Sequence, residues 1–155
     1  MKVLVGTSGY AYKQWKGSFY PEKLKDADML AFYASRFPTV EINNTFYRMP
    51  AKPALAKWVE ETPETFTFVL KAPKRITHEK RLGDVADPLA YLFEAASVMG
   101  AKLGPVLFQL PPFQRKDADL LREFVSTLPD GACAAFEFRH ASWFDDEVLD
   151  VLRAR

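Results

Sequence analysis

The strongest constraint on the fold is the regular alternation of short apolar segments with longer segments of helical period. The apolar segments are rich in β-branched and aromatic residues, which favours β-strands. They occupy residues 3–6, 40–43, 66–71, 106–110 and 134–139. Segments of helical character lie between them at 26–37, 53–62, 88–99 and 117–128, and a last one opens near residue 145. This order predicts about five βα units with right-handed crossovers and a parallel sheet.

The two alternate sets of side chains in these strands differ in polarity. One set is apolar, and we expect it to face the helices: Val40, Ile42, Phe66, Phe68, Leu70, Val106, Phe108, Leu110, Phe136 and Phe138. The other set carries Glu41, Asn43, Thr67, Lys71, Gln109, Glu137 and Arg139. Helices on both faces of an open sheet would bury these charges at a large desolvation cost, whereas the mouth of a barrel keeps them hydrated. We therefore predict an α/β fold, a TIM-type (β/α) barrel that is incomplete because five strands do not close it.

Length and composition fit one domain that spans residues 1–155. The chain has 155 residues, of which 48% are hydrophobic, so it can bury a sizeable core. A net charge of +1 excludes the global basic field of many nucleic-acid binders, so any basic site must be local. The apolar run at the N-terminus is too short for a signal peptide and no transmembrane run is present, so we expect a cytoplasmic protein without a membrane partner. The single cysteine, Cys133, is predicted to be a buried core residue at the start of the fifth strand.

Six groups of motifs resemble one known family across the whole chain. They are GTSGY at 6–10 with WKG at 15–17 and FYP at 19–21; EINNTFY at 41–47 followed by Pro50; Trp58 with Thr62 and Pro63; FVLK at 68–71 with Thr77 and His78; FQLPP at 108–112; and EFRH at 137–140 with Ser142 and Trp143. In this order they resemble the YecE-like proteins, also known as domain of unknown function 72. The resemblance implies a TIM-barrel-like fold and no settled biochemical activity. The family pattern continues with further βα units, so the chain resembles the N-terminal part of the family.

The carboxyl ends of the strands are where barrels of this kind place their active sites. The residues that should ring one pocket there are Ser8, Tyr10, Glu41, Asn43, Tyr47, Lys71, His78, Gln109, Glu137, Arg139 and His140. Lys71, Arg139 and His140 collect positive charge, and arginine offers a planar fork for carboxylate or phosphate. This pattern predicts a small anionic ligand. The neighbouring charges Lys74, Arg75, Lys80 and Arg81 are instead predicted to be solvent-facing loop residues.

Glu41 and Glu137 are the candidate catalytic residues, because in a ring of strands they could face each other as an acid/base pair. They could also hold a divalent metal together with a histidine, although no cofactor is indicated directly. The alternative is a structural layer in which Lys71 or Arg139 neutralises each carboxylate. His78-Glu79 lacks the spacing of a zinc protease, because position 82 is leucine.

Two other features receive structural interpretations. The turn after the first strand matches neither the dinucleotide nor the P-loop pattern, so Ser8 is more simply a turn residue than a nucleophile. Aromatic residues at the mouth could stack on sugars or bases but are mostly expected to anchor loops. They are Tyr10, Tyr12, Trp15, Phe46, Tyr47 and Trp143.

Three functional hypotheses follow. The first is a barrel enzyme, best described as hydrolase-like, that acts on a small anionic or phosphorylated ligand with Glu41 and Glu137 in catalytic roles. The second is a non-catalytic module that binds nucleic acid or a protein through its basic and aromatic mouth. The third is an inactive fragment that self-associates through an open sheet edge.

Overall fold

Five parallel strands form one open sheet in the computed structural model, which describes residues 3–48 and 51–154. The strands are β1 (Gly6–Ser8), β2 (Thr39–Ile42), β3 (Thr67–Lys71), β4 (Leu103–Gln109) and β5 (Ala134–Glu137). They lie in the order β1-β2-β3-β4-β5, and every neighbouring pair is parallel. Pro50, which belongs to the second motif, lies outside the described residues. The predicted α/β fold with five βα units and an incomplete barrel is confirmed.

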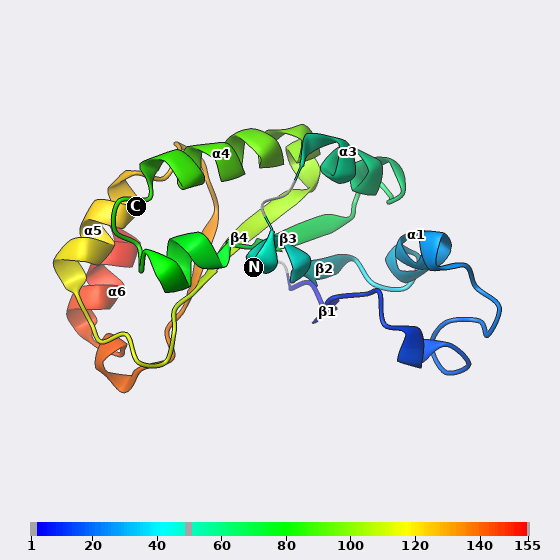
Figure 1. The fold of residues 1–155 in the computed structure, drawn as a ribbon, viewed down its shortest axis with the longest axis horizontal. Coiled ribbons are helices and arrows are strands. Elements are labelled where there is room, and N and C mark those ends of the chain that lie inside the picture. The colour runs from blue at the N-terminus through cyan, green and yellow to red at the C-terminus, as the bar shows by residue number, and fades with distance from the viewer. Residues whose placement is uncertain (1–2, 49–50, 155) are drawn as a thin grey trace.

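The helices follow one another in an arc around the strands (Figure 1). They are α1 (Met29–Ala34), the short α2 (Asn44–Tyr47), α3 (Lys52–Glu60), α4 (Ala86–Ala96), α5 (Ala118–Ser126) and α6 (Asp146–Arg153). Short 3-10 turns occur at Lys13–Trp15, Asp26–Asp28, Ser97–Lys102 and Ala141–Trp143, and a π-helical turn occurs at Arg75–Glu79. The predicted helix at 26–37 is therefore shorter, because its first turn is 3-10 and its α-helical part ends at Ala34.

The predicted division of polarity between the two faces of the sheet holds for the inner strands. Val40, Phe68, Leu70, Val106 and Phe108 are fully buried or nearly so against the helices. Two clusters make up this core, one under α1 and α3 and the other under α4, α5 and α6. The opposite set, which includes Glu41, Lys71, Gln109 and Glu137, is half-buried.

The predicted position of the first strand, residues 3–6, is wrong, because β1 spans Gly6–Ser8. Pairing begins at Gly6, which lies opposite Thr39, the first residue of β2. Val3 and Val5 precede this pair and are 71% and 64% exposed. A strand needs a neighbour for its backbone groups, and β2 does not extend far enough to supply one.

The fifth strand is shorter and more exposed than predicted, because it forms an edge of the sheet. Its last paired residue is Glu137, opposite Gln109 at the end of β4. Phe136 and Phe138 pack on the core but are only half-buried. Cys133 is exposed, so its predicted burial is wrong. Cys133, Phe136 and Phe138 lie in or beside β5, which has a neighbouring strand on one side only.

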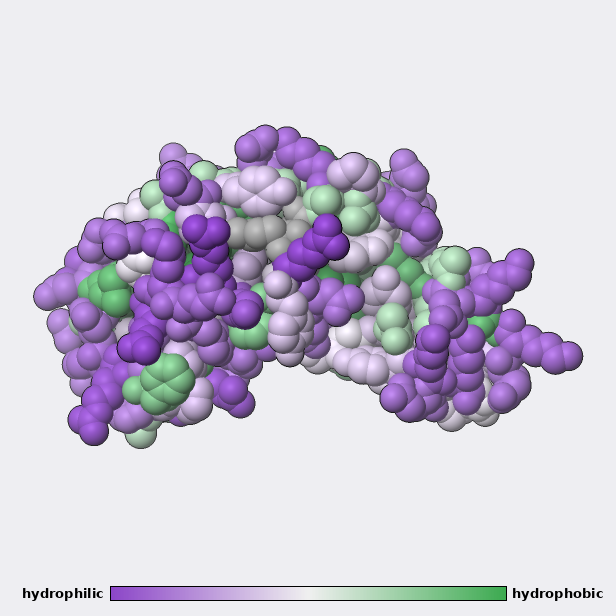
Figure 2. All heavy atoms as spheres, in the orientation of Figure 1, coloured by the Kyte–Doolittle hydropathy of each residue, from purple (hydrophilic) through white to green (hydrophobic). Residues whose placement is uncertain are grey.

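Polar and charged residues cover most of the face seen in Figure 2, and smaller apolar areas lie between them. In the part of the chain that the structure describes, no helix has the length and hydrophobicity needed to cross a membrane.

Candidate functional site

The predicted site residues all lie at or just beyond the carboxyl ends of the strands. Ser8 ends β1 and Tyr10 follows it, Glu41 and Asn43 lie on either side of Ile42, the last residue of β2, and Tyr47 ends α2. Lys71 ends β3 and His78 lies in the π-helical turn after it, while Gln109 ends β4. Glu137, Arg139 and His140 complete the set at the end of β5. Eight of these side chains form three groups along this edge of the sheet rather than one ring, and Tyr10, Tyr47 and His140 lie outside the groups.

The first group joins the ends of β1 and β2. Ser8 Oγ donates a hydrogen bond to Glu41 Oε1 at 2.9 Å, and Asn43 Nδ2 donates to Ser8 Oγ at 2.6 Å. The Tyr12 hydroxyl donates to the Ser8 carbonyl at 2.5 Å. These contacts tie the loop after β1 to β2, and they fix the direction of the Glu41 carboxylate.

The second group combines two basic residues with an aromatic ring. Lys71 Nζ lies 5.2 Å from the centre of the Phe46 ring, and the His78 ring meets the same ring edge-on at 4.9 Å. Buried Thr45 fastens α2 to this place, because its Oγ1 lies 2.6 Å from the Lys71 carbonyl and 2.8 Å from the Ile42 carbonyl. A cation over an aromatic face is held without losing its charge, so Lys71 remains able to meet an anion.

The segment that carries His78 has an unusual backbone. Arg75–Glu79 forms a π-helical turn, and Arg81, Leu82 and Asp84 have φ values of 51°, 76° and 49°. Positive φ is costly for residues other than glycine, and both features are frequent at functional sites. Buried Ile76 and Leu82 anchor the segment. The charges at Lys74, Arg75, Lys80 and Arg81 are exposed, as predicted.

The third group joins the ends of β4 and β5. Gln109 Nε2 donates to Glu137 Oε2 at 2.7 Å, and Arg139 Nε lies 3.4 Å from Glu137 Oε1. One oxygen of Glu137 thus accepts a hydrogen bond and the other forms an ion pair, so the carboxylate has a defined orientation. About half of the Arg139 side chain remains exposed, so its guanidinium can still meet a ligand.

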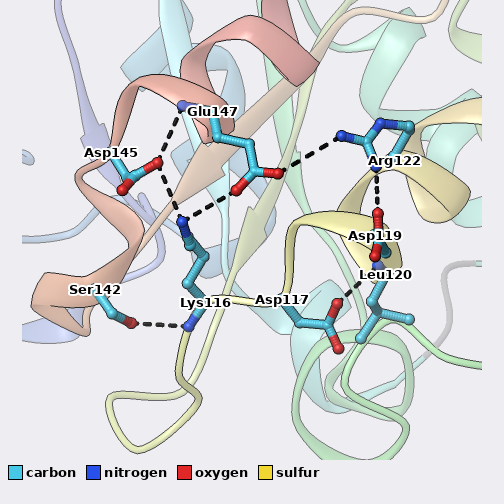
Figure 3. A network of polar contacts seen from close by, with 8 residues as sticks. All are labelled: Lys116, Asp117, Asp119, Leu120, Arg122, Ser142, Asp145 and Glu147. Carbon is cyan, nitrogen blue, oxygen red and sulfur yellow. Dashed lines mark hydrogen bonds and ion pairs between the residues drawn. The ribbon is translucent and has the colours of Figure 1, made fainter.

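His140 is fixed by its own loop. The Ser142 amide donates to His140 Nδ1 at 3.1 Å, which leaves the ring proton of neutral His140 on Nε2. Ser142 Oγ lies 2.9 Å from the same nitrogen and accepts from the Lys116 amide. Figure 3 shows how the Lys116 side chain extends this contact to Asp145 and Glu147, so the loop after β4 is tied to the loop that carries His140.

Positive charge converges on His78. Burial lowers the pKa of His78, and the charges of Lys71 and Arg139 lower it further. The effect of Arg139 is informative, because this residue belongs to the third group and lies two strands away from Lys71 in the sheet order. The second and third groups therefore lie near enough for their charges to interact, and we call Lys71, His78 and Arg139 the basic region.

The two candidate catalytic glutamates have different partners. β2 and β5 are separated by three strand spacings, about 14 Å along the sheet. Glu41 is bound to Ser8, whereas Glu137 is bound to Gln109 and Arg139. Their action as one acid/base pair stays a prediction. Within residues 3–48 and 51–154, no group of three or more His, Cys, Asp or Glu side chains is arranged to hold a metal ion.

The two candidate tyrosines lie outside these groups. Tyr10 packs at the edge of the core beside Tyr33, and burial together with the charge of Glu61 raises its pKa. Tyr47 is 74% exposed and contacts Phe46 with its ring. Trp143, by contrast, is a buried loop anchor whose Nε1 donates to the Gln114 carbonyl, as expected for most of these aromatic residues.

A separate pocket with a cavity volume of about 150 Å³ lies at the ends of β1 and β2. Its lining includes Tyr10, Tyr12, Asn43, Asn44 and Trp58. Asn44 and Trp58 were not among the residues predicted from the sequence. The adjacent asparagines directly after a predicted strand were the available signal, whereas Trp58 lies in a helix whose period indicates only packing.

The chain matches the model of a family described as "Protein of unknown function DUF72" over residues 4–155. It is 34% identical to the UPF0759 protein YunF of Bacillus subtilis, over 98% of this chain and 57% of YunF. It is 30% identical to the UPF0759 protein YecE of Escherichia coli K12, over 72% of this chain and 42% of YecE. The chain thus spans about half the length of these relatives.

Solved structures of DUF72 family proteins are also similar to this chain. A DUF72 family protein of Thermotoga maritima superposes with a TM-score of 0.73 at 29% identity, over 97% of this chain and 61% of the other. A DUF72 family protein of Enterococcus faecalis superposes with a TM-score of 0.63 at 26% identity, over 82% and 54%.

Proposed function

The chain belongs to the DUF72 family, a family of unknown function, and we propose that it binds a small anionic ligand, a phosphate ester above all, at the carboxyl ends of β3, β4 and β5. The observation that carries the proposal is that Lys71 and His78 contact the same Phe46 ring, with the half-exposed Arg139 at the end of β5. The charges of Lys71 and Arg139 both act on His78 and lower its pKa. Like charges repel, so a fold that brings three basic side chains together at a strand edge is stabilised by an anion between them.

The surrounding geometry supports this assignment. Lys71 is held by a ring rather than by a carboxylate, and Arg139 contacts Glu137 through Nε, which leaves its terminal nitrogens free of that ion pair. The strained segment that carries His78 lies beside the same region. A planar guanidinium and an ammonium group together suit a phosphate group with several oxygens.

Hydrolysis is the reaction class that we propose for the full-length relatives. Glu137 is the better placed of the two glutamates, because it lies beside the basic region and its carboxylate is oriented by Gln109 and Arg139. It would accept a proton from a water molecule as the water oxygen attacks phosphorus. The ester P–O bond then breaks, and the leaving alkoxide takes a proton from solvent. The basic side chains stabilise the charge that develops on the phosphoryl oxygens.

Replacing Lys71 by methionine is expected to weaken the binding of inorganic phosphate about fivefold, because one cationic partner is lost while the stem of the side chain is kept. Isothermal titration calorimetry at constant ionic strength measures this effect. The matched control is Lys74→Met, which removes an exposed lysine that pairs with Glu79 on the surface. We expect the control to bind phosphate as the parent does.

Equal phosphate affinities in the two variants, or no measurable binding in the parent, would contradict the proposed site. A nucleic-acid partner gives a different result. Binding of a single-stranded oligonucleotide would weaken with log salt in proportion to the number of phosphates contacted, with a slope well beyond that of one phosphate. Nucleic-acid binding, self-association through the free edge of β5 and cytoplasmic localisation stay predictions.

The lowered pKa of His78 gives the site a pH dependence of definite sign. Without ligand, His78 gains its proton at a lower pH than an ordinary histidine does. A bound anion favours the protonated ring, so the affinity for sulfate, which keeps its charge, should rise by a few-fold as the pH falls from about 8 to about 5.5. Calorimetric titrations across this range measure the slope.

The His78→Gln variant should bind sulfate with little dependence on pH. The control is His140→Gln, because His140 is held in its own loop by the Ser142 amide and lies outside the second group. A slope that is the same in the parent and in His78→Gln would show that another group is responsible.

A further inference from the structure

The pocket at the ends of β1 and β2 differs in character from the basic region. Its cavity volume of about 150 Å³ is smaller than that of drug-sized sites, so it has room for a single small ring. The described residues that line it carry no charged side chain, and they provide three aromatic rings and two amide groups: Tyr10, Tyr12 and Trp58 with Asn43 and Asn44. An ionic group would find no partner in this lining, so the pocket suits a neutral part of a ligand.

The polar groups of this lining are suited to hydroxyl groups. An asparagine side chain both donates and accepts, as a sugar hydroxyl does, and two such amides lie next to each other in the pocket. Asn43 uses its Nδ2 to bind Ser8, which leaves its Oδ1 as an acceptor at the wall. Aromatic side chains beside amides offer an apolar surface for the C–H groups of a sugar ring.

The pocket and the basic region are joined by α2, which has only four residues. Asn44 begins this helix and lines the pocket, and Phe46 two residues later contacts both Lys71 and His78. Two residues correspond to a rise of about 3 Å along a helix axis. Thr45 between them holds α2 against the end of β3 through the Lys71 carbonyl. The pocket and the residues Lys71 and His78 therefore flank the same short helix.

We propose that the two regions bind one ligand, a sugar phosphate, with its ring in the pocket of Tyr12, Asn44 and Trp58 and its phosphate at Lys71, His78 and Arg139. The inference rests on the proposed function, because it assigns the phosphate to the same basic region. It adds the chemical class of the rest of the ligand. The hydrogen-bonded side chains of Ser8, Glu41 and Asn43 lie at the end of the same two strands as the pocket.

The test compares three probes by calorimetry: glucose 6-phosphate, inorganic phosphate and glucose. The sugar phosphate should bind the parent about tenfold more tightly than inorganic phosphate, because the ring adds hydrogen bonds and buried apolar surface. Asn44→Ala should weaken the binding of glucose 6-phosphate about fivefold and leave the affinity for inorganic phosphate unchanged. Asn44 is exposed at the start of α2, so the variant should fold as the parent does.

The matched control is Gln14→Ala, which removes an exposed amide from the neighbouring turn that does not line the pocket. It should bind all three probes as the parent does. Lys71→Met should weaken glucose 6-phosphate and inorganic phosphate by the same factor. If inorganic phosphate binds but the sugar adds no affinity, or if Asn44→Ala and Gln14→Ala behave alike, the sugar site is wrong and the anion site stands. If neither phosphate compound binds, the proposed function fails as well.

Discussion

Replacing Lys102 by methionine is expected to lower the free energy of unfolding by about 3 kcal/mol. Lys102 is only 4% exposed, and its Nζ donates to the carbonyls of Val59 and Thr62 at 2.7 Å and 2.8 Å. Val59 lies in the last turn of α3 and Thr62 follows the helix, where backbone acceptors need partners from outside the helix. Methionine fills the space of the lysine stem but leaves the Thr62 carbonyl without this donor, whereas the Val59 carbonyl keeps the Thr62 amide and hydroxyl. Urea denaturation followed by circular dichroism measures the loss.

The control for this prediction is Lys57→Met, which changes a lysine within α3 itself. Lys57 is exposed and pairs with Glu61 on the surface at 3.5 Å, so its removal should change the free energy of unfolding by less than about 0.5 kcal/mol. If Lys102→Met costs no more than Lys57→Met, water replaces the ammonium group and the end of α3 is stable without it. The ion pair of Lys102 with exposed Glu64, at 3.8 Å, would then also contribute nothing measurable to the free energy of unfolding.

The sequence predicts the layers of the fold because they depend on local periodicity. Alternating apolar residues in β2, β3 and β4 have one stable arrangement, in which the apolar set is covered by helices. The ends of the strands depend on their neighbours instead. β1 starts at Gly6 because β2 starts at Thr39, and β5 is exposed because it has a partner on one side. No local pattern carries that information.

The candidate site is predictable in place but not in connectivity. The rule that functional residues follow parallel strands brings the basic and acidic side chains to one edge, as the structure has them. It does not say which of them meet. The contact of Lys71 with Phe46, and the cap that Lys102 forms on α3, join residues far apart in the chain through side-chain geometry. The π-helical turn at Arg75–Glu79 was likewise hidden, because its sequence is typical of a hydrated loop.

Replacing Glu137 by glutamine is expected to reduce hydrolytic turnover by about a thousandfold, because the amide keeps the shape of the side chain but cannot accept a proton from water. The variant is made in this chain and at the matching position of the longer relative YunF. The assay measures release of inorganic phosphate from a panel of phosphate monoesters that includes glucose 6-phosphate. The melting temperature should stay near that of the parent, since Gln109 and Arg139 remain in place and the side chain is only half-buried.

Two matched variants separate a catalytic role from a structural one. Glu147→Gln removes a surface carboxylate of the Lys116 network and should leave turnover unchanged. Glu41→Gln tests the other candidate, and a smaller loss there is expected because Glu41 is bound to Ser8 outside the basic region. A lowered melting temperature with unchanged turnover in Glu137→Gln would make this carboxylate a structural partner of Arg139. Absence of phosphate release by the parent YunF from every ester would remove hydrolysis and leave ligand binding as the function of the site.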